Sequence, residues 1–451
     1  MKSHLLLYSL ALFLLLTIPL GCRSASQEAE EVGPGHRFKP ASDAVISSPI
    51  AFDFDGDGEL EIAVGSWDGY FYLLDKRLND LPGWPKHSPK GFFSSPSLAD
   101  LDEDSVPEIV VGSEAGKLFA WNAAGDDARG FPVDLGYRLW ASPAVSTEPG
   151  TPDAGGQAIA IGSLEQMHLL DARGQPLDGW PQPIYGWPDA TAAFAPLAEG
   201  QGILTVTTLT PGDPSRGWLY AWRENGSLLP GFPVELPMDS DSSPAVADFD
   251  GDGRWWIVAG DDAGWLHVVD TGGQERPNFP VRTAGPGAGP TPTPHPPGGN
   301  IYSIEASPAV ADLDGDGRLE IAAGSWDGRM YLWDDGGQLL QGWPIAVNDQ
   351  IISSAALVDL DGDERLDIVV GSKDGHLYGW TVEGTTLPGF PYDLGAPVFS
   401  SPWVGDLEGD GQADIVVGAN NGIHLLEDVG PLGRQAWPTF HRDAQRTGVA
   451  P

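Results

Sequence analysis

Six short segments of this sequence place carboxylates at alternate positions of a nine-residue stretch. Carboxylates so close together repel one another unless a cation lies between them. Ca²⁺ accepts about six to eight oxygen ligands, which this spacing can supply. The candidate ligands are Asp53, Asp55, Asp57 and Glu61; Asp100, Asp102, Asp104 and Glu108; Asp248, Asp250 and Asp252; Asp312, Asp314, Asp316 and Glu320; Asp359, Asp361, Asp363 and Asp367; and Asp406, Glu408, Asp410 and Asp414.

The six acidic segments are not equivalent. Five have a carboxylate at the ninth position, whereas the third has Trp256 there, so its site lacks a ligand and is expected to bind calcium weakly or to be empty. A single segment of this kind would be equally typical of a solvated turn. The recurrence in register favours calcium, and magnesium is less suitable because it retains its waters in a rigid octahedron.

The acidic segments belong to a repeat that extends along the chain. A Ser-Ser-Pro-like anchor recurs at Pro49, Pro96, Pro143, Pro196, Pro244, Pro308, Ala355 and Pro402. A second marker, an aromatic residue followed by Pro, occurs late in each unit: Trp84-Pro85, Phe131-Pro132, Trp180-Pro181, Phe232-Pro233, Phe279-Pro280, Trp343-Pro344, Phe390-Pro391 and Trp437-Pro438. Both markers indicate eight units, and the register of Trp84, Trp180 and Trp343 predicts core positions.

Each unit has the pattern of four short antiparallel strands. In the sixth unit, apolar segments at 307–311, 321–325, 330–333 and 340–347 are separated by the acidic loop, an Asp-Gly turn and a Gly-Gly turn. Four strands in roughly 47 residues are typical of a propeller blade. We therefore predict an all-β fold, a single β-propeller over residues 37–451 with eight four-stranded blades, and seven blades as the alternative.

The sequence also resembles a known family. Asp312-x-Asp314-Gly-Asp316-Gly, followed by Glu320-Ile, Gly324-Ser and Asp327-Gly, is similar to FG-GAP (VCBS-type) repeats, which build the propeller of integrin α-chains and of bacterial surface proteins. The resemblance spans about residue 44 to the C-terminus, with units three and four degenerate. It implies calcium loops and a binding or adhesion role. Eight blades resemble instead the calcium-containing propeller of rhamnogalacturonan lyases.

The N-terminal segment has the features of an export signal. Lys2 precedes an apolar run, Leu5–Leu20, which is short for a membrane span with these flanks. The ending Ile18–Cys22 resembles a bacterial lipobox, so residues 1–22 are expected to be a signal with lipidation at Cys22, or a plain secretory signal. Residues 23–36 are expected to form an acidic flexible tether. The protein is thus expected in the bacterial cell envelope, lipid-anchored, or secreted.

Two further segments stand outside the regular pattern. Phe38-Lys39-Pro40, before the first unit, is similar to the aromatic-Pro marker, and we predict that it contributes to the seam between the first and last blades. The Pro/Gly-rich insert 283–300 lengthens one repeat and is predicted to be an exposed flexible loop. The motif His441-Arg442-Asp443 is expected to take part in ring closure rather than in catalysis.

Strand order places the acidic loops on one rim and leaves the opposite rim for ligands. There, the residue three before each anchor should guard the channel mouth: Ile46, Phe93, Trp140, Ala193, Asp241, Glu305, Ile352 and Phe399. Nearby hairpins add Trp67, Asp68, Trp326, Asp327 and Lys373. From these we select Trp67, Phe93, Trp140, Asp241, Glu305, Trp326 and Phe399 as candidate ligand-binding residues. The alternative is that Phe93, Trp140 and Phe399 simply plug the channel.

Composition narrows the possible functions. A net charge of −40 argues against binding to nucleic acid, whose phosphates require clustered Lys and Arg. No nucleophile–base arrangement can be assembled, so no catalytic residue is assigned. We expect a monomeric, calcium-stabilised binding or adhesion module for an extracellular or periplasmic protein or glycan, with any membrane contact through a lipid anchor. The alternative is a carbohydrate-active enzyme of the lyase type.

Overall fold

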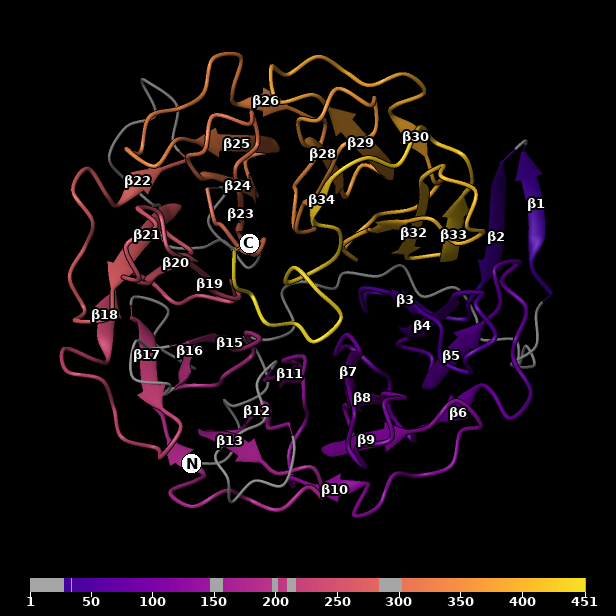
Figure 1. Ribbon diagram of the computed structural model, residues 1–451, viewed down its shortest axis with the longest axis horizontal. Helices are drawn as coiled ribbons and strands as arrows, with labels where there is room; N and C mark the ends of the chain where they lie inside the picture. Colours follow the sequence, from indigo (N-terminus) through magenta and orange to yellow (C-terminus); the bar gives the residue numbers. More distant parts are fainter. Residues whose placement is uncertain are drawn as a thin grey trace, which may run out of the picture.

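The computed structural model describes residues 28–33, 35–146, 157–196, 202–208, 216–283 and 302–450. These residues form eight antiparallel β-sheets that are arranged as blades in a closed ring (Figure 1). The prediction of an all-β, eight-bladed propeller is confirmed, and the seven-bladed alternative is wrong. In the described ranges, no helix is long and apolar enough to cross a membrane.

The first four blades follow one another along the chain. Their strands, from the channel outward, are β3 (Ile50–Phe52), β4 (Glu61–Gly65), β5 (Tyr70–Leu74) and β6 (Lys86–His87); β7 (Ser97–Ala99), β8 (Glu108–Gly112), β9 (Lys117–Trp121) and β10 (Val133–Asp134); β11 (Ala144–Val145), β12 (Ile159–Ser163), β13 (Gln166–Leu170) and β14 (Gln182–Pro183); and β15 (Ala193–Pro196), β16 (Gly202–Thr208), β17 (Gly217–Arg223) and β18 (Val234–Leu236).

The last four blades repeat the order, with additions in blades 7 and 8. Their strands are β19 (Ala245–Ala247), β20 (Trp256–Gly260), β21 (Trp265–Asp270) and β22 (Val281–Arg282); β23 (Ala309–Ala311), β24 (Glu320–Ser325), β25 (Arg329–Trp333) and β26 (Ile345–Ala346); β34 (Gln435–Trp437), β27 (Ala356–Val358), β28 (Asp367–Gly371), β29 (His376–Trp380) and β30 (Tyr392–Asp393); and β31 (Trp403–Gly405), β32 (Asp414–Ala419), β33 (Gly422–Leu426), β2 (His36–Pro40) and β1 (Glu30–Gly33).

A closed circle of hydrogen bonds explains the recurring Ser-Ser-Pro anchor. In every blade the residue before the anchor position donates its backbone N–H to the side-chain hydroxyl of the equivalent residue in the next blade, at 2.9–3.1 Å. The circle runs through Ser48, Ser95, Ser142, Thr191, Ser243, Ser307, Ser354 and Ser401, and returns to Ser48. All eight blades are therefore joined at one level around the channel.

The circle corrects the sequence alignment of unit four. Thr191 occupies the ring position there. The anchor of blade 4 is therefore Ala192, immediately before β15, and not Pro196, which lies at the end of that strand. Unit four lacks the Ser-Ser-Pro motif, but the hydroxyl of Thr191 accepts the same hydrogen bond.

The tryptophans of the aromatic-Pro marker lie in the core between blades, as predicted. Trp84, Trp180 and Trp343 are buried. Each indole N–H donates to a backbone carbonyl of the following blade, at Ala123, Glu224 and Val382 respectively. The Trp-Pro marker thus packs neighbouring blades against each other and adds one hydrogen bond between them.

The ring is closed by the N-terminal segment. Strand β2 pairs antiparallel with β33 and so supplies the fourth strand of blade 8, which confirms the predicted seam. Strand β1 pairs with β2 inside the segment that we expected to be a flexible tether, so that expectation fails for residues 30–33. Trp437-Pro438 does not supply the fourth strand of blade 8; β34 pairs instead with the inner strand β27 of blade 7. The signal segment with Cys22, and the insert beyond Thr283, lie outside the described residues.

The C-terminal segment fills the centre of the ring (Figure 1). Its backbone carbonyls accept hydrogen bonds from inner-strand N–H groups of five blades, donated by Leu98, Val145, Phe194, Val246 and Val404. Arg446 is fully buried there, and its guanidinium donates to the carbonyl oxygens of Pro96 and Ser48. His441 is also fully buried and contacts the carbonyl of Pro244. This arrangement agrees with the structural role expected for the His441-Arg442-Asp443 motif.

Candidate functional site

The acidic loops have a common internal geometry. Each joins the first and second strands of its blade, so the ninth residue begins the buried second strand. In the first loop, Asp53 accepts the backbone N–H groups of Gly56 and Gly58 at 2.7 and 3.0 Å, and Asp57 accepts that of Glu59 at 2.8 Å. The loop is therefore held in a tight turn with its carboxylate oxygens gathered together, as a calcium loop requires.

The ninth carboxylate is held in the same way in all five complete loops. One of its oxygens accepts the N–H of the second loop residue at 2.8–2.9 Å, as between Glu61 and Phe54 or between Asp367 and Leu360. Burial, together with the neighbouring carboxylates, raises the pKa of Glu61 to about 7 and that of Glu320 to about 8. An acid buried among carboxylates is destabilised when ionised unless a cation balances it.

Four loops bring three carboxylate oxygens within 4.8 Å of one another. They are Asp53, Asp55 and Asp57; Asp100, Asp102 and Asp104; Asp312, Asp314 and Asp316; and Asp359, Asp361 and Asp367. In the blade 7 loop Asp363 is drawn away by Arg365, whose Nε lies 2.9 Å from it. Among the described residues, these four loops are the best-formed candidate metal sites.

Two arginine side chains pair with carboxylates of the third loop. The guanidinium of Arg276 makes two bonds of 3.1 Å to Asp250, and Arg254 lies 2.8 Å from Asp252. Arg276 also stacks against Trp256, 4.9 Å from the ring centroid. A fixed cation thus stands near the place where the other loops would hold an ion, which supports the expectation that this loop binds calcium weakly or not at all.

The opposite rim carries the channel mouth. Phe93 and Trp140 stack with ring centroids 5.2 Å apart, and Trp67 meets Phe93 edge-on at 5.8 Å. The Lys373 ammonium lies 6.0 Å from Trp326 and 5.8 Å from Phe399. The structure thus brings the predicted aromatic residues into two groups; all are partly exposed except Trp326, which is buried.

The register of blade 4 changes the composition of this mouth. Since its anchor is Ala192, the residue three positions earlier is Asp189, and Ala193 is fully buried in β15. Asp189, Asp241 and Glu305 therefore occupy the same position in the consecutive blades 4, 5 and 6. The equivalent residues in the other blades are Ile46, Phe93, Trp140, Ile352 and Phe399. The mouth has an acidic sector and an apolar sector.

Arg138 lies at the boundary between the two sectors. Its guanidinium stacks on Trp140, 3.5 Å from the ring centroid, and also faces Trp187 at 4.8 Å. Its Nη2 lies 3.6 Å from a carboxylate oxygen of Asp189. Nε of Arg138, Nε1 of Trp140 and Oδ1 of Asp241 are buried without a hydrogen-bond partner in the described structure. Such unpaired groups favour a ligand that supplies the missing partners.

The hairpin aspartates of this rim have a structural role. Tyr331 and Tyr378, on the third strands of their blades, donate their hydroxyls to Asp327 at 2.6 Å and Asp374 at 2.7 Å. Asp68 likewise accepts the N–H of Tyr70 at 3.0 Å. These carboxylates fix the turns between the second and third strands, so Asp68 and Asp327 are less available to a ligand than Asp241 and Glu305.

Comparison with known proteins supports the fold and the repeat. The family model of the FG-GAP-like repeat matches residues 312–370 and 359–417, which run from the blade 6 loop to β32. Residues 312–417 of the β-propeller therefore carry FG-GAP-like repeats. No curated protein matches the chain.

The propeller is also similar to solved structures, at identities that show the fold alone. The computationally designed Ika8 protein is 16% identical, with a TM-score of 0.56 over 86% of this chain and 98% of that one. Sqt1 of Saccharomyces cerevisiae is 12% identical, with a TM-score of 0.59 over 88% and 98%. The quinohemoprotein alcohol dehydrogenase of Comamonas testosteroni is 12% identical, with a TM-score of 0.58 over 87% and 76%.

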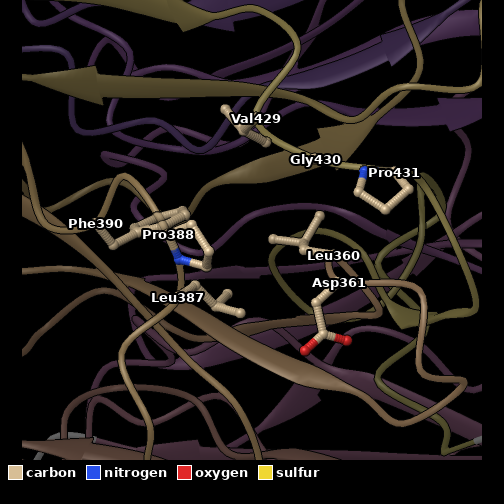
Figure 2. A pocket seen from close by; sticks show the side chains of 8 residues that line it. All are labelled: Leu360, Asp361, Leu387, Pro388, Phe390, Val429, Gly430 and Pro431. Carbon is tan, nitrogen blue, oxygen red and sulfur yellow. The ribbon is translucent and has the colours of Figure 1, made fainter.

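A groove lies beside the blade 7 loop of the propeller. Its volume is about 320 Å³, and it is lined by Leu360, Asp361, Leu387, Pro388, Phe390, Val429, Gly430 and Pro431 (Figure 2). Asp361 is the only charged residue in this lining. The functional groups that the sequence missed, Arg138, Asp189 and Arg276, lie elsewhere, and only the corrected register of unit four could have indicated Asp189.

Proposed function

We propose that this protein is an exported, calcium-stabilised propeller that binds a protein or glycan at the channel mouth opposite its acidic loops. The observation that carries the proposal is the chemical difference between the two rims of the ring. One rim gathers carboxylates in repeated loops, and the other presents partly exposed aromatic rings beside unpaired polar atoms.

The loop geometry supports calcium in a structural role. Four of the five complete loops offer clustered carboxylates, and all five have a ninth carboxyl whose pKa is raised by burial, so an ion would relieve repulsion inside the fold. The loops connect the two inner strands of their blades. Calcium would therefore stabilise the strands that form the channel wall and leave the opposite mouth free.

The mouth supports binding rather than catalysis. Aromatic rings such as Phe93 and Trp140 offer flat apolar surfaces for a sugar ring or for an apolar side chain of a partner. The N-terminal signal and the lipobox-like ending at Cys22 favour a position in the cell envelope, where both kinds of partner are accessible.

Calcium removal tests the structural half of the proposal. EDTA should lower the melting temperature by about 10 °C or more, because each saturated site adds about 2.7 kcal/mol when calcium is present at a hundredfold its Kd. Asp312→Asn should reduce this calcium-dependent shift, whereas the equivalent Asp248→Asn in the third loop should not. A melting temperature that is unaffected by EDTA would refute the calcium role.

A binding screen tests the other half. Purified protein in millimolar calcium is applied to glycan and protein arrays, and each hit is repeated with Trp140→Ala. Tyr185→Ala serves as the control, since Tyr185 is 72% exposed and is not among the mouth residues. The proposal expects Trp140→Ala to abolish binding that Tyr185→Ala retains; equal binding by both variants would place the ligand site elsewhere.

A further inference from the structure

The acidic sector of the mouth contains more carboxylates than the position-matched Asp189, Asp241 and Glu305. Asp239 and Asp262 interact with Asp241 and Glu305, and Asp239 is only 5% and Asp262 only 7% exposed. Ser303 donates its hydroxyl to Oδ1 of Asp262 at 2.6 Å. Oδ1 of Asp239, by contrast, is buried and accepts no N–H or O–H group of the described part of the chain, while the Asp239 carboxyl faces that of Asp262. A nine-tenths-buried carboxylate with an unpaired oxygen calls for a donor from outside the fold.

These carboxylates act on one another electrostatically. Burial and then the charges of Asp262 and Asp241 raise the pKa of Asp239. Burial and the charges of Asp262, Asp241 and Asp239 likewise raise the pKa of Glu305. The groups therefore form one interacting cluster rather than separate surface carboxylates, and it holds protons that a bound cation would displace.

The fold supplies little positive charge to this cluster. Arg138 pairs with Asp189 at 3.6 Å. Burial and the charge of Asp262 raise the pKa of Asp241 to about 7, although Arg138 opposes them. The ammonium of Lys373 is bonded to Oε1 of Gln350 at 2.8 Å, over the ring of Trp326. The charged neighbours that perturb Asp239 and Glu305 are all carboxylates. Within the described part of the chain, the cluster thus has no positive group at its centre.

The spacing of the cluster indicates the size of the cation that it could bind. Among the described residues, carboxylate oxygens from three groups converge within 4.8 Å only in the acidic loops. The mouth carboxylates are thus more widely spread than the ligands of a small metal ion. An ammonium or guanidinium group, which donates several hydrogen bonds in different directions, fits this spacing better.

We propose that the acidic sector binds an organic cation, a primary ammonium or guanidinium group, through Asp239, Asp241 and Glu305, while Phe93 and Trp140 in the apolar sector contact the uncharged part of the ligand. The inference rests on the proposed function and names the chemistry of its ligand. The group is supplied either by a free polyamine or by an Arg or Lys side chain of a partner protein.

Calorimetry with defined probes tests the inference. Arginine amide, spermidine and an arginine-containing tripeptide are titrated into the full chain in millimolar calcium, which keeps the acidic loops saturated. Citrulline amide is the neutral control for arginine amide. We expect arginine amide to bind at least about tenfold more tightly than citrulline amide, and Asp241→Asn with Glu305→Gln to remove that preference. Tighter binding of spermidine than of the tripeptide identifies a polyamine, and the reverse order identifies a partner side chain.

Asp126→Asn with Asp127→Asn is the matched control, because it removes the same charge from an exposed turn of blade 2. Equal binding of arginine amide and citrulline amide, or equal loss in the two double variants, would overturn the inference. Such a result would leave the proposed function intact if array ligands still depend on Trp140. Loss of that dependence would instead refute the proposed function itself.

Discussion

At the scale of single residues, Arg276 shows how one side chain can replace an ion. It bonds twice to Asp250 and packs against Trp256, the residue that occupies the ninth position of the third loop. Arg276→Gln together with Trp256→Glu should therefore convert this loop into a calcium site. We expect one additional bound calcium per chain, measured by elemental analysis after dialysis.

The control for this conversion is Arg365→Gln in the blade 7 loop. Arg365 bonds to Asp363 in a loop that already has its ninth carboxylate, so the calcium count should stay unchanged. If the Arg276 and Trp256 double variant binds no more calcium than the unmodified chain, the third loop is not kept empty by its arginine.

The carboxyl of Asp189, at the channel mouth, makes the stability of the folded protein depend on pH. Burial and the charge of Asp241 raise its pKa to about 7, although Arg138 opposes them. The folded protein then binds more protons than the unfolded chain between about pH 4 and pH 7, so stability falls as pH rises through this window. The stability of the Asp189→Asn variant should not fall in this way. Its free energy of unfolding, relative to that of the parent, should increase by about 2 kcal/mol from pH 5 to pH 8.

Urea unfolding in excess calcium at the two pH values measures this gain. Asp126→Asn removes an exposed carboxylate and should show the same stability difference from the parent at both values. A pH-independent effect of Asp189→Asn would mean that Asp189 is ionised throughout the range.

At the scale of structural elements, the hydroxyl circle joins each inner strand to the next blade. Ser95→Ala removes the hydroxyl that accepts the N–H of Ser48 and leaves that buried donor unpaired. The free energy of unfolding should fall by about 1–3 kcal/mol, measured by chemical denaturation. Ser227→Ala, at an exposed turn of blade 4, should change it by less than about 0.5 kcal/mol. Equal effects would show that the circle adds nothing to stability.

The sequence could predict the elements but not every register. Alternating apolar segments, Asp-Gly turns and repeated Trp-Pro pairs were sufficient for the strand order, the blade number and the buried tryptophans. Unit four was misaligned because Pro196 resembles the anchor proline. Thr191 makes the hydrogen bonds of the ring position there, although the Ser-Ser-Pro motif is absent. Asp189 was missed for the same reason. Arg276 was missed because it lies 26 positions after Asp250, on the far side of two strands.

At the scale of the whole molecule, the chain holds its ring together at both ends. Strand β2 completes blade 8 from the N-terminal side, and the C-terminal segment enters the channel (Figure 1). Backbone contacts of this kind carry no side-chain pattern, so the sequence indicated that the ending was structural without showing where it lies. The two ends act together because each contacts strands that are distant in sequence.

Arg446 is the residue through which the central segment can be tested. It is fully buried, and its guanidinium donates to Pro96 and Ser48 in two blades and to Thr439 and Phe440 within the segment itself. Arg446→Met keeps most of the side-chain volume but leaves these oxygens unpaired in the channel. The free energy of unfolding should therefore fall by about 3–5 kcal/mol, measured by denaturant unfolding in calcium. Arg442→Met is the matched control, because Arg442 is 30% exposed and lies 3.7 Å from Asp443. If both variants were equally stable, the blades would be joined without the central segment, and the hydroxyl circle and blade packing alone would have to close the ring.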